Sequence, residues 1–456
     1  MTPKTHPPTR WENLCNFALT HPAKALAVSF IVWKFLLLVI IVCSPGPGYD
    51  TSTTLLSSGW TGETTLSSAP WRFVRWDSIY YLRMAERGNL FEQEWAFGYG
   101  YTRMLSLFGS GEDGVLPLAI AGIGISHICH FLSVLILYAL TKNVFGSSNN
   151  DDGAFCFVSA ALHIISPAGA FLSAPYGEAI FSFLNFAGFY VYCSALLDER
   201  RGNSVRRSAK HIVAGALFAA ATTNRSNGLL SGALFAYDAV FVSLRIVTSG
   251  ISFDRLLHLL SIIMGGIIVA LGVLWPQYVA YTLYCGADVV SRPWCEKAIP
   301  SIYGWVQSHY WNVGFLRYWT ISNLPLFCLA IPILTLLIRS SIWALSGEAS
   351  SDQLQYGKAE DKELGRYSQL QDCLTRLALP QGLLAIMALL VYHVQIITRI
   401  SSGYPLWYWY LASRIFRRSA TNEHPAKGVE AKLIVQVMVL YGLIQGGLFA
   451  SFLPPA

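Results

Sequence analysis

Long uninterrupted apolar runs constrain this chain more than any other feature of its sequence. The first extends from about Ala25 to Cys43, and ten further runs follow it. About twenty apolar residues in a helix match the roughly 30 Å hydrocarbon thickness of a bilayer. Charged residues make up 13% of the 456 residues, whereas soluble domains carry about 25%. The sequence therefore predicts an all-α polytopic membrane protein with about 11 transmembrane helices.

These runs predict one integral membrane domain over residues 1–456, without a separate soluble domain. Two of them, 211–223 and 404–416, are short, and we interpret them as broken or re-entrant helices. The expected spans lie near 25–43, 115–141, 154–173, 177–197, 211–223, 227–247, 256–283, 319–339, 379–398, 404–416 and 432–453.

The charges of the loops predict an orientation in the membrane. Loops 198–211 and 413–432 each hold five lysines and arginines against two acidic residues. The positive-inside rule places both in the cytoplasm, and alternation of the spans then makes the N-terminus cytoplasmic as well. The polar stretch 341–378 falls on the same side as a flexible loop. The net charge of +6 thus reflects cytoplasmic loops, and we expect no nucleic-acid binding.

The opposite face receives the first loop, 44–114, the loop 284–318 and three short connections. In the first loop, Phe73, Trp76, Tyr80 and Met84 recur at spacings of three and four residues, and Gly88-Asn89 follows as a stop signal. This pattern is typical of a helix that lies in the membrane interface.

Asp77 is the candidate catalytic residue of this helix. A carboxylate flanked by Trp76 and tyrosines at the interface can meet a lipid-linked donor and a polar acceptor, and act as a general base. The alternative is a solvated carboxylate or a partner of Arg72 or Arg75. Downstream, Glu94 lies among aromatic residues that can stack on sugar rings, although an ordinary loop explains the same letters.

Other polar residues on this face are candidate substrate-binding groups. An arginine between apolar spans, such as Arg225, is costly unless it faces a cavity or an anion, and phosphate is a natural partner. Snorkelling to the interface is the alternative. Glu178 begins a span, where a carboxylate also stabilises a helix N-terminus. The remaining candidates are His309, His393 and Arg399, each of which also suits a structural role.

Cys285 and Cys295 share one polar loop. On an oxidising side of the membrane they can form a disulfide, and two free thiols are the alternative. The sequence has no C-x-x-C pair and no evident carboxylate cluster, so we expect no metal site.

Several blocks together resemble the GPI mannosyltransferase 2 family, in the expected order and over about Trp71 to Tyr408. They read WDSIYYLRMAERG, EQEWAFGYG, SPAGAFLSAPYGE, NRSNG, RPWC and HYWNVGFLRYW.

The resemblance implies a GT-C glycosyltransferase of the endoplasmic reticulum, with a lumenal active site. It implies dolichyl-phosphate mannose as donor and a glycosylphosphatidylinositol (GPI) precursor bearing one mannose as acceptor. The product would carry a second mannose in α-1,6 linkage. The catalytic aspartate of the family falls on Asp77. The resemblance implies no cofactor, because the lipid-linked donor is itself a substrate, and a small membrane protein subunit is left open as a partner.

Two other functions share the multi-span composition. A transporter or lipid scramblase would place functional charges near the bilayer midplane, whereas here the polar groups gather at one face. A non-catalytic subunit of a membrane glycosylation complex would have the same spans without needing Asp77.

Overall fold

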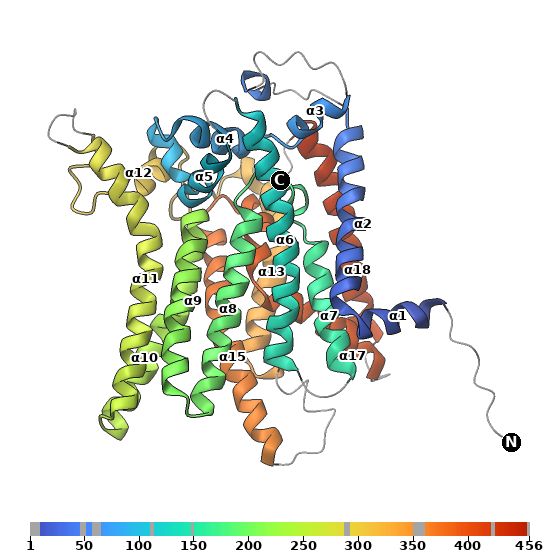
Figure 1. Ribbon diagram of the computed structural model, residues 1–456, viewed down its shortest axis with the longest axis vertical. Coiled ribbons are helices and arrows are strands. Elements are labelled where there is room, and N and C mark those ends of the chain that lie inside the picture. The colour runs from blue at the N-terminus through green and yellow to red at the C-terminus, as the bar shows by residue number, and fades with distance from the viewer. Residues whose placement is uncertain are drawn as a thin grey trace.

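The protein folds as an all-helical bundle in a computed structural model (Figure 1). The structure describes residues 10–45, 52–56, 65–109, 114–146, 150–286, 292–349, 361–420 and 425–453. Parts of the predicted loops 44–114, 284–318, 341–378 and 413–432 lie outside these residues. The helices are α1 Arg10–Thr20, α2 Pro22–Cys43, η1 Ser52–Leu55, α3 Thr65–Arg72, α4 Asp77–Arg87, η2 Glu92–Ala96, α5 Tyr99–Leu105, η3 Ser106–Phe108, α6 Leu116–Phe145, α7 Asn150–Ile164, η4 Gly169–Leu172, α8 Glu178–Arg200, α9 Ser204–Asn224, η5 Ser226–Ser231, α10 Gly232–Ser249, α11 Phe253–Tyr284, α12 Ile302–His309, η6 Ile321–Asn323, α13 Leu324–Leu345, α15 Asp361–Leu390, η7 Val394–Ile396, α16 Ile397–Ile400, η8 Ser401–Gly403, α17 Leu406–Ala420 and α18 Pro425–Ala450.

Eight described helical segments are long and apolar enough to cross a membrane. Within α7, residues Gly153–Ile164 form an apolar helix that is shorter than these eight. The predicted multi-pass all-α class is therefore confirmed, and the total of about 11 spans stays a prediction. The eight segments are Pro22–Cys43, Leu116–Phe145, Glu178–Arg200, Ser226–Ser249, Phe253–Tyr284, Ile321–Leu345, Tyr367–Leu390 and Val429–Ala450.

Helix α2 shows how these segments present two apolar faces. Leu26 and Leu37 are buried against the bundle, whereas Ile31, Val32 and Phe35 are more than 60% exposed on the outer face. A helix that is apolar all round needs protein on one side and lipid on the other. The outer surface of the bundle therefore suits a bilayer.

The centre of the bundle holds aromatic residues together with satisfied polar groups. Trp407, Tyr408 and Trp409 at the start of α17 are fully buried. The Tyr408 hydroxyl lies 2.8 Å from Nδ1 of His163, and the Trp409 indole donates to the Thr141 hydroxyl at 2.8 Å. Hydrogen bonding between helices offsets the cost of burying such groups.

The structure differs from two predicted span boundaries. The apolar run 154–173 does not form one helix, because α7 ends at Ile164 and the chain continues as a mostly buried segment that contains the short 3-10 helix η4. The prediction of a flexible loop over 341–378 is wrong for the described residues of that stretch. Helix α13 extends to Leu345, and α15 begins at Asp361. Its buried residues Leu370, Cys373, Leu374 and Leu377 recur at helical spacing and pack into the core.

The first loop forms a cap of short helices at one end of the bundle. Helices α3, α4, α5 and α12 gather at this end in Figure 1, and the α8–α9 and α10–α11 turns lie at the other end. The single interfacial helix predicted across Trp71–Arg87 is broken into α3 and α4, although it ends at Gly88 as expected.

Candidate functional site

A sharp backbone corner places Asp77 at the first residue of α4. Trp76 precedes the helix with φ of 54° and ψ of −126°, a conformation that non-glycine residues rarely adopt. The Ser78 side chain holds the corner, since it accepts from the Arg75 amide at 2.7 Å and donates to the Arg75 carbonyl at 2.6 Å. The break in the predicted helix thus places Asp77 at the start of a separate helix, α4.

The Arg75 side chain anchors this corner to distant parts of the chain. Its Nε donates to the Ala450 carbonyl of α18 at 3.0 Å, and its Nη1 donates to the Thr53 hydroxyl at 3.0 Å. The Tyr176 hydroxyl donates to the Arg75 carbonyl at 2.7 Å. Arg75 therefore has a structural role at this corner.

Four residues from distant segments form one ion-pair network at the capped end. Arg399 of α16 binds Asp77 through Nη2 at 2.8 Å and Glu178 through Nε at 2.8 Å. Arg225, which follows α9, places its Nη1 2.8 Å from the same Glu178 oxygen. The sequence predicted each of these residues separately, and the structure brings them together.

The four side chains differ in how much of their surface is exposed. The Glu178 side chain is fully buried, those of Arg399 and Arg225 are 12% and 14% exposed, and that of Asp77 is 35% exposed. A buried carboxylate needs compensating cations, and Glu178 has two. Two negative and two positive charges make the network neutral, with its most accessible group at Asp77.

Aromatic side chains enclose the Arg399 guanidinium. Its carbon lies 4.1 Å from the ring centroid of Phe171 and 5.0 Å from that of Tyr176. Burial alone would lower the pKa of Arg399, but the carboxylates of Glu178 and Asp77 raise it above its ordinary value. Burial also raises the pKa of Tyr81, which lies beside the network, so this phenol stays protonated and is unsuited to act as a base.

Two glycines allow the sequence blocks to meet around Arg225. A Cβ at Gly98 would lie 2.0 Å from the carbonyl oxygen of Asn224, and one at Gly177 would lie 3.1 Å from it. The FGYG and PYGE blocks therefore pack directly on the backbone of the NRSNG block. This close approach requires residues without side chains.

Glu94 does not join the network. Its carboxylate binds Arg87 at 2.6 Å and accepts from the backbone amides of Leu90 and Phe91 at 2.7 and 3.1 Å. It is buried and closes the turn between α4 and η2. A direct contact of Glu94 with substrate stays a prediction.

The two histidines and Trp76 also lie outside the network. His309 is exposed and stacks on Trp305 at 4.4 Å. His393 lies 2.9 Å from the Trp311 carbonyl through Nε2, and burial lowers its pKa, which favours a neutral imidazole at pH 7. Trp76 packs against Phe452 at 5.6 Å. Their roles in substrate binding stay predictions.

The loop after α11 is fastened to the cap. A disulfide joins Cys285 to Cys295, which decides between the two alternatives that the sequence left open. The buried Trp294 donates through its indole to Glu92 at 3.1 Å, and Tyr310 donates to the same carboxylate at 3.2 Å. The described part of the loop 284–318 therefore packs over η2, on the side of the bundle where Asp77 lies.

Sequence reasoning assigned no role to Phe171, Tyr176 or Tyr81. All three lie in the sequence blocks that resemble the family, and their place in those blocks was the signal that could have identified them. Within the described ranges, no group of three histidine, cysteine or acidic side chains is placed to hold a metal ion.

The chain is similar to several known proteins. The family model described as Mannosyltransferase (PIG-V) matches residues 24–456. GPI mannosyltransferase 2 of Aspergillus oryzae is 50% identical over 96% of each chain, and that of Aspergillus fumigatus is 46% identical over 95% of this chain and 94% of its own. Among solved structures, the oligosaccharyltransferase of Archaeoglobus fulgidus in the apo form matches with a TM-score of 0.45 and 15% identity, covering 94% of this chain and 56% of that one.

Proposed function

The chain belongs to the PIG-V mannosyltransferase family, and from that membership we propose that it adds a mannose to a GPI precursor that already bears one mannose. The donor in this proposal is dolichyl-phosphate mannose, the new linkage is α-1,6, and the enzyme is of the GT-C class. Its relatives named GPI mannosyltransferase 2 support the acceptor class. Membership in an enzyme family also disfavours the transporter and non-catalytic alternatives.

The observation that carries the proposed mechanism is the network of Asp77, Arg399, Glu178 and Arg225. Asp77 has the more accessible of the two carboxylates, and it stands at the first residue of α4. In the proposed step Asp77 accepts the proton of the acceptor 6-hydroxyl. The hydroxyl oxygen bonds to C1 of mannose while the C1–O bond to phosphate breaks, and the electron pair leaves with dolichyl phosphate.

The arginines suit the charge that develops on the departing phosphate. Arg225 contacts Glu178 through Nη1, which leaves other N–H groups of its guanidinium to meet a phosphate oxygen. Arg399 is the second candidate and is already oriented by two carboxylates. Preorganised cations of this kind stabilise developing charge without reorganising during the reaction. The proposal needs no metal ion or cofactor.

We assign the site to the lumenal side of the endoplasmic reticulum membrane, with a cytoplasmic N-terminus. The basic 198–211 loop supports this assignment, because it lies at the end of the bundle opposite α4 and α5 (Figure 1).

Replacement of Asp77 by asparagine tests the proposed base. Asp77→Asn keeps an acceptor for Arg399 but removes the proton acceptor, so kcat should fall roughly 10²- to 10⁴-fold. Initial rates of mannose transfer from dolichyl-phosphate mannose, measured with purified protein, give the answer. Glu86→Gln is the matched control, since Glu86 lies on the same helix and pairs with Arg83. Unchanged transfer by a correctly folded Asp77→Asn protein would exclude Asp77 as the base.

A further inference from the structure

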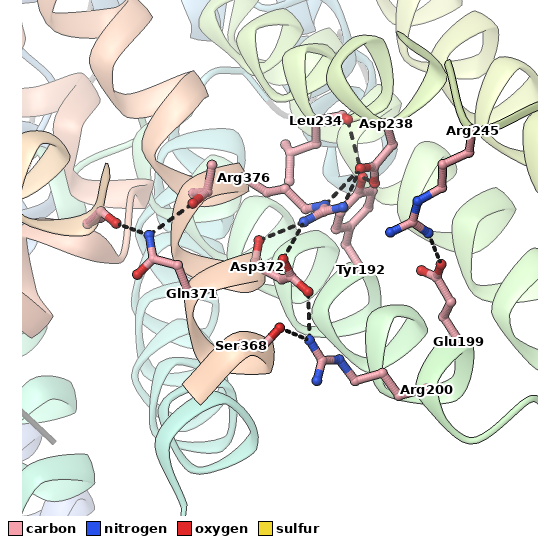
Figure 2. Close-up of polar contacts among 12 residues, drawn as sticks. Tyr192, Glu199, Arg200, Leu234, Asp238, Arg245, Ser368, Gln371, Asp372 and Arg376 are labelled. Carbon is pink, nitrogen blue, oxygen red and sulfur yellow. Dashed lines mark hydrogen bonds and ion pairs between the residues drawn. The ribbon is translucent and has the colours of Figure 1, made fainter. Parts of the chain in front are cut away.

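A second polar site lies at the end of the bundle opposite Asp77. Helices α8, α10, α11 and α15 enclose a cavity of about 420 Å³ there, and Figure 2 shows the polar contacts around it. This volume is within the range of small-molecule sites in proteins and exceeds that of a single ion. The lining includes Glu199 and Arg200 of α8, Asp238, Phe241 and Arg245 of α10, His258 of α11, and Ser368, Asp372 and Arg376 of α15.

The inner wall of this cavity is a buried and fully paired charge cluster. Arg376 binds Asp238 through Nε at 2.8 Å and Nη2 at 2.7 Å, and the Tyr192 hydroxyl donates to the other Asp238 oxygen (Figure 2). Arg376 and Asp238 are both more than nine-tenths buried. This wall is therefore rigid and has little capacity left for a ligand.

The outer wall has more exposed pairs than the inner wall. Arg245 approaches Glu199 at only 3.4 Å, and its side chain is 53% exposed. Arg200 binds Asp372 at 2.7 Å near the mouth of the cavity. His258 is 6% exposed, and within the described part of the chain its Nε2 has no hydrogen-bond partner. A buried ring nitrogen without a partner, lining a polar cavity, indicates room for a further polar group.

The charges of the lining balance. Three arginines, Arg200, Arg245 and Arg376, face three carboxylates, Glu199, Asp238 and Asp372. A net-anionic ligand would gain little from such a wall, whereas a zwitterion finds a cation for its negative end and a carboxylate for its positive end.

The aromatic residues of the cavity indicate which kind of ammonium group the zwitterion carries. The Arg245 guanidinium lies 4.5 Å from the ring centroid of Phe241, and that of Arg376 lies 5.3 Å from the ring centroid of Tyr237. A quaternary ammonium is bound best by open aromatic faces, and these faces already hold arginines. A primary ammonium instead donates hydrogen bonds to carboxylates, which this cavity supplies.

The surroundings indicate that the ligand arrives from the bilayer. Val247 on α10 and Phe253 at the start of α11 are each 82% exposed beside the cavity end of the bundle. Apolar side chains this exposed suit lipid rather than water. The apolar segments Glu178–Arg200 and Tyr367–Leu390 each have one end at or beside the lining of the cavity, as expected for a site near the boundary between hydrocarbon and headgroups.

We propose that this cavity binds the headgroup of phosphatidylethanolamine from the leaflet opposite the Asp77 network. The phosphate accepts hydrogen bonds from Arg245 and Arg200, and the primary ammonium donates to Glu199. This site does not depend on the proposed transfer reaction.

Lipid retention by the full-length protein tests this proposal. The protein is reconstituted in nanodiscs with equal parts of phosphatidylethanolamine, phosphatidylcholine and phosphatidylglycerol, released, and analysed by native mass spectrometry. We expect about tenfold enrichment of phosphatidylethanolamine over both other lipids, the effect of one favourable charged hydrogen bond. Equal retention of the three lipids, or preference for phosphatidylglycerol, would overturn the proposal without any mutation.

Two variants then locate the bound lipid. Glu199→Gln combined with Arg245→Gln should abolish the enrichment. Arg339→Gln combined with Glu430→Gln removes a comparable exposed pair on α13 and α18, outside this cavity, and should leave the enrichment unchanged. Enrichment that survives the first pair of substitutions would place the lipid elsewhere. Displacement of the lipid by micromolar O-phosphoethanolamine would identify a soluble ligand instead and contradict the proposal.

Discussion

Glu178 sets the geometry of both arginines although it is the least accessible residue of the network. Its side chain is fully buried, and Arg225 and Arg399 both bind one of its oxygens. Loss of both cations would leave a buried carboxylate without compensation, which destabilises a protein strongly. A test that removes both arginines must therefore also neutralise Glu178.

At the residue scale we predict that the arginines contribute to transition-state stabilisation. Arg225→Gln and Arg399→Gln should each lower kcat about 100-fold, because each removes a fixed positive charge near the leaving phosphate. A triple variant that adds Glu178→Gln avoids the uncompensated carboxylate. Transfer rates are compared with those of Arg103→Gln, an exposed arginine of the cap that should change the rate less than twofold. Wild-type rates in the triple variant would remove both arginines from the mechanism.

The sequence identified the members of the network but not their pairing. Asp77, Glu178, Arg225 and Arg399 are separated by up to 322 positions, and the pattern of charges assigns residues to a face of the membrane without positioning them on it. The same limit explains why Glu94, His309 and His393 were grouped with them. The close-packed contacts around Arg399 depend on how α4, α8 and α16 meet, which hydropathy does not encode.

The position of Arg225 depends on how the helix ends around it pack. Gly98, which precedes α5, packs on Asn224, the last residue of α9. Gly98→Ala would force a Cβ to within 2.0 Å of the Asn224 carbonyl oxygen, so the backbone has to move. We expect a 10- to 100-fold loss of kcat, since displacements of about 1 Å are this costly in enzymes. Gly124→Ala on α6 is the control, because open space surrounds that position. Equal rates for the two variants would contradict the prediction.

The buried pair between α10 and α15 should dominate the stability of that side of the bundle. Arg376→Met leaves Asp238 buried without its cation, so we expect the free energy of unfolding to fall by about 3 kcal/mol or more. Chemical denaturation in mixed micelles measures the change. Arg339→Gln, in a pair that is more than half exposed on both sides, should cost less than about 1 kcal/mol. Equal losses for the two variants would show that the buried pair has no special role.

The membrane-spanning helices were predictable because hydrocarbon requires a fixed length of apolar residues. The errors occurred where protein, not lipid, surrounds the chain. Residues 165–177 are apolar and buried by neighbouring helices, so the run 154–173 was mistaken for one span. Residues 361–378 are polar on average, yet the apolar positions from Leu370 onward face the core, so a helix was mistaken for a loop.

At the scale of the whole molecule, the two ends of the bundle should lie on opposite sides of the membrane. A protease site inserted at Gly202, in the α8–α9 turn, should be cleaved in sealed microsomes, because basic loops face the cytoplasm. One inserted at Ile299, which is 84% exposed beside the disulfide-linked loop, should be protected until detergent is added. Immunoblotting distinguishes the fragments, and the reverse pattern would place Asp77 in the cytosol.

The hydrogen bond from Arg75 to Ala450 links the beginning of the chain to α18. Phe452 extends this link, since its ring lies 4.5 Å from the Arg75 guanidinium and 5.6 Å from Trp76. The corner before Asp77 is thus completed by residues that the ribosome makes 375 positions after Arg75 and beyond. A nascent polypeptide should remain inactive until α18 has been made and has entered the bilayer.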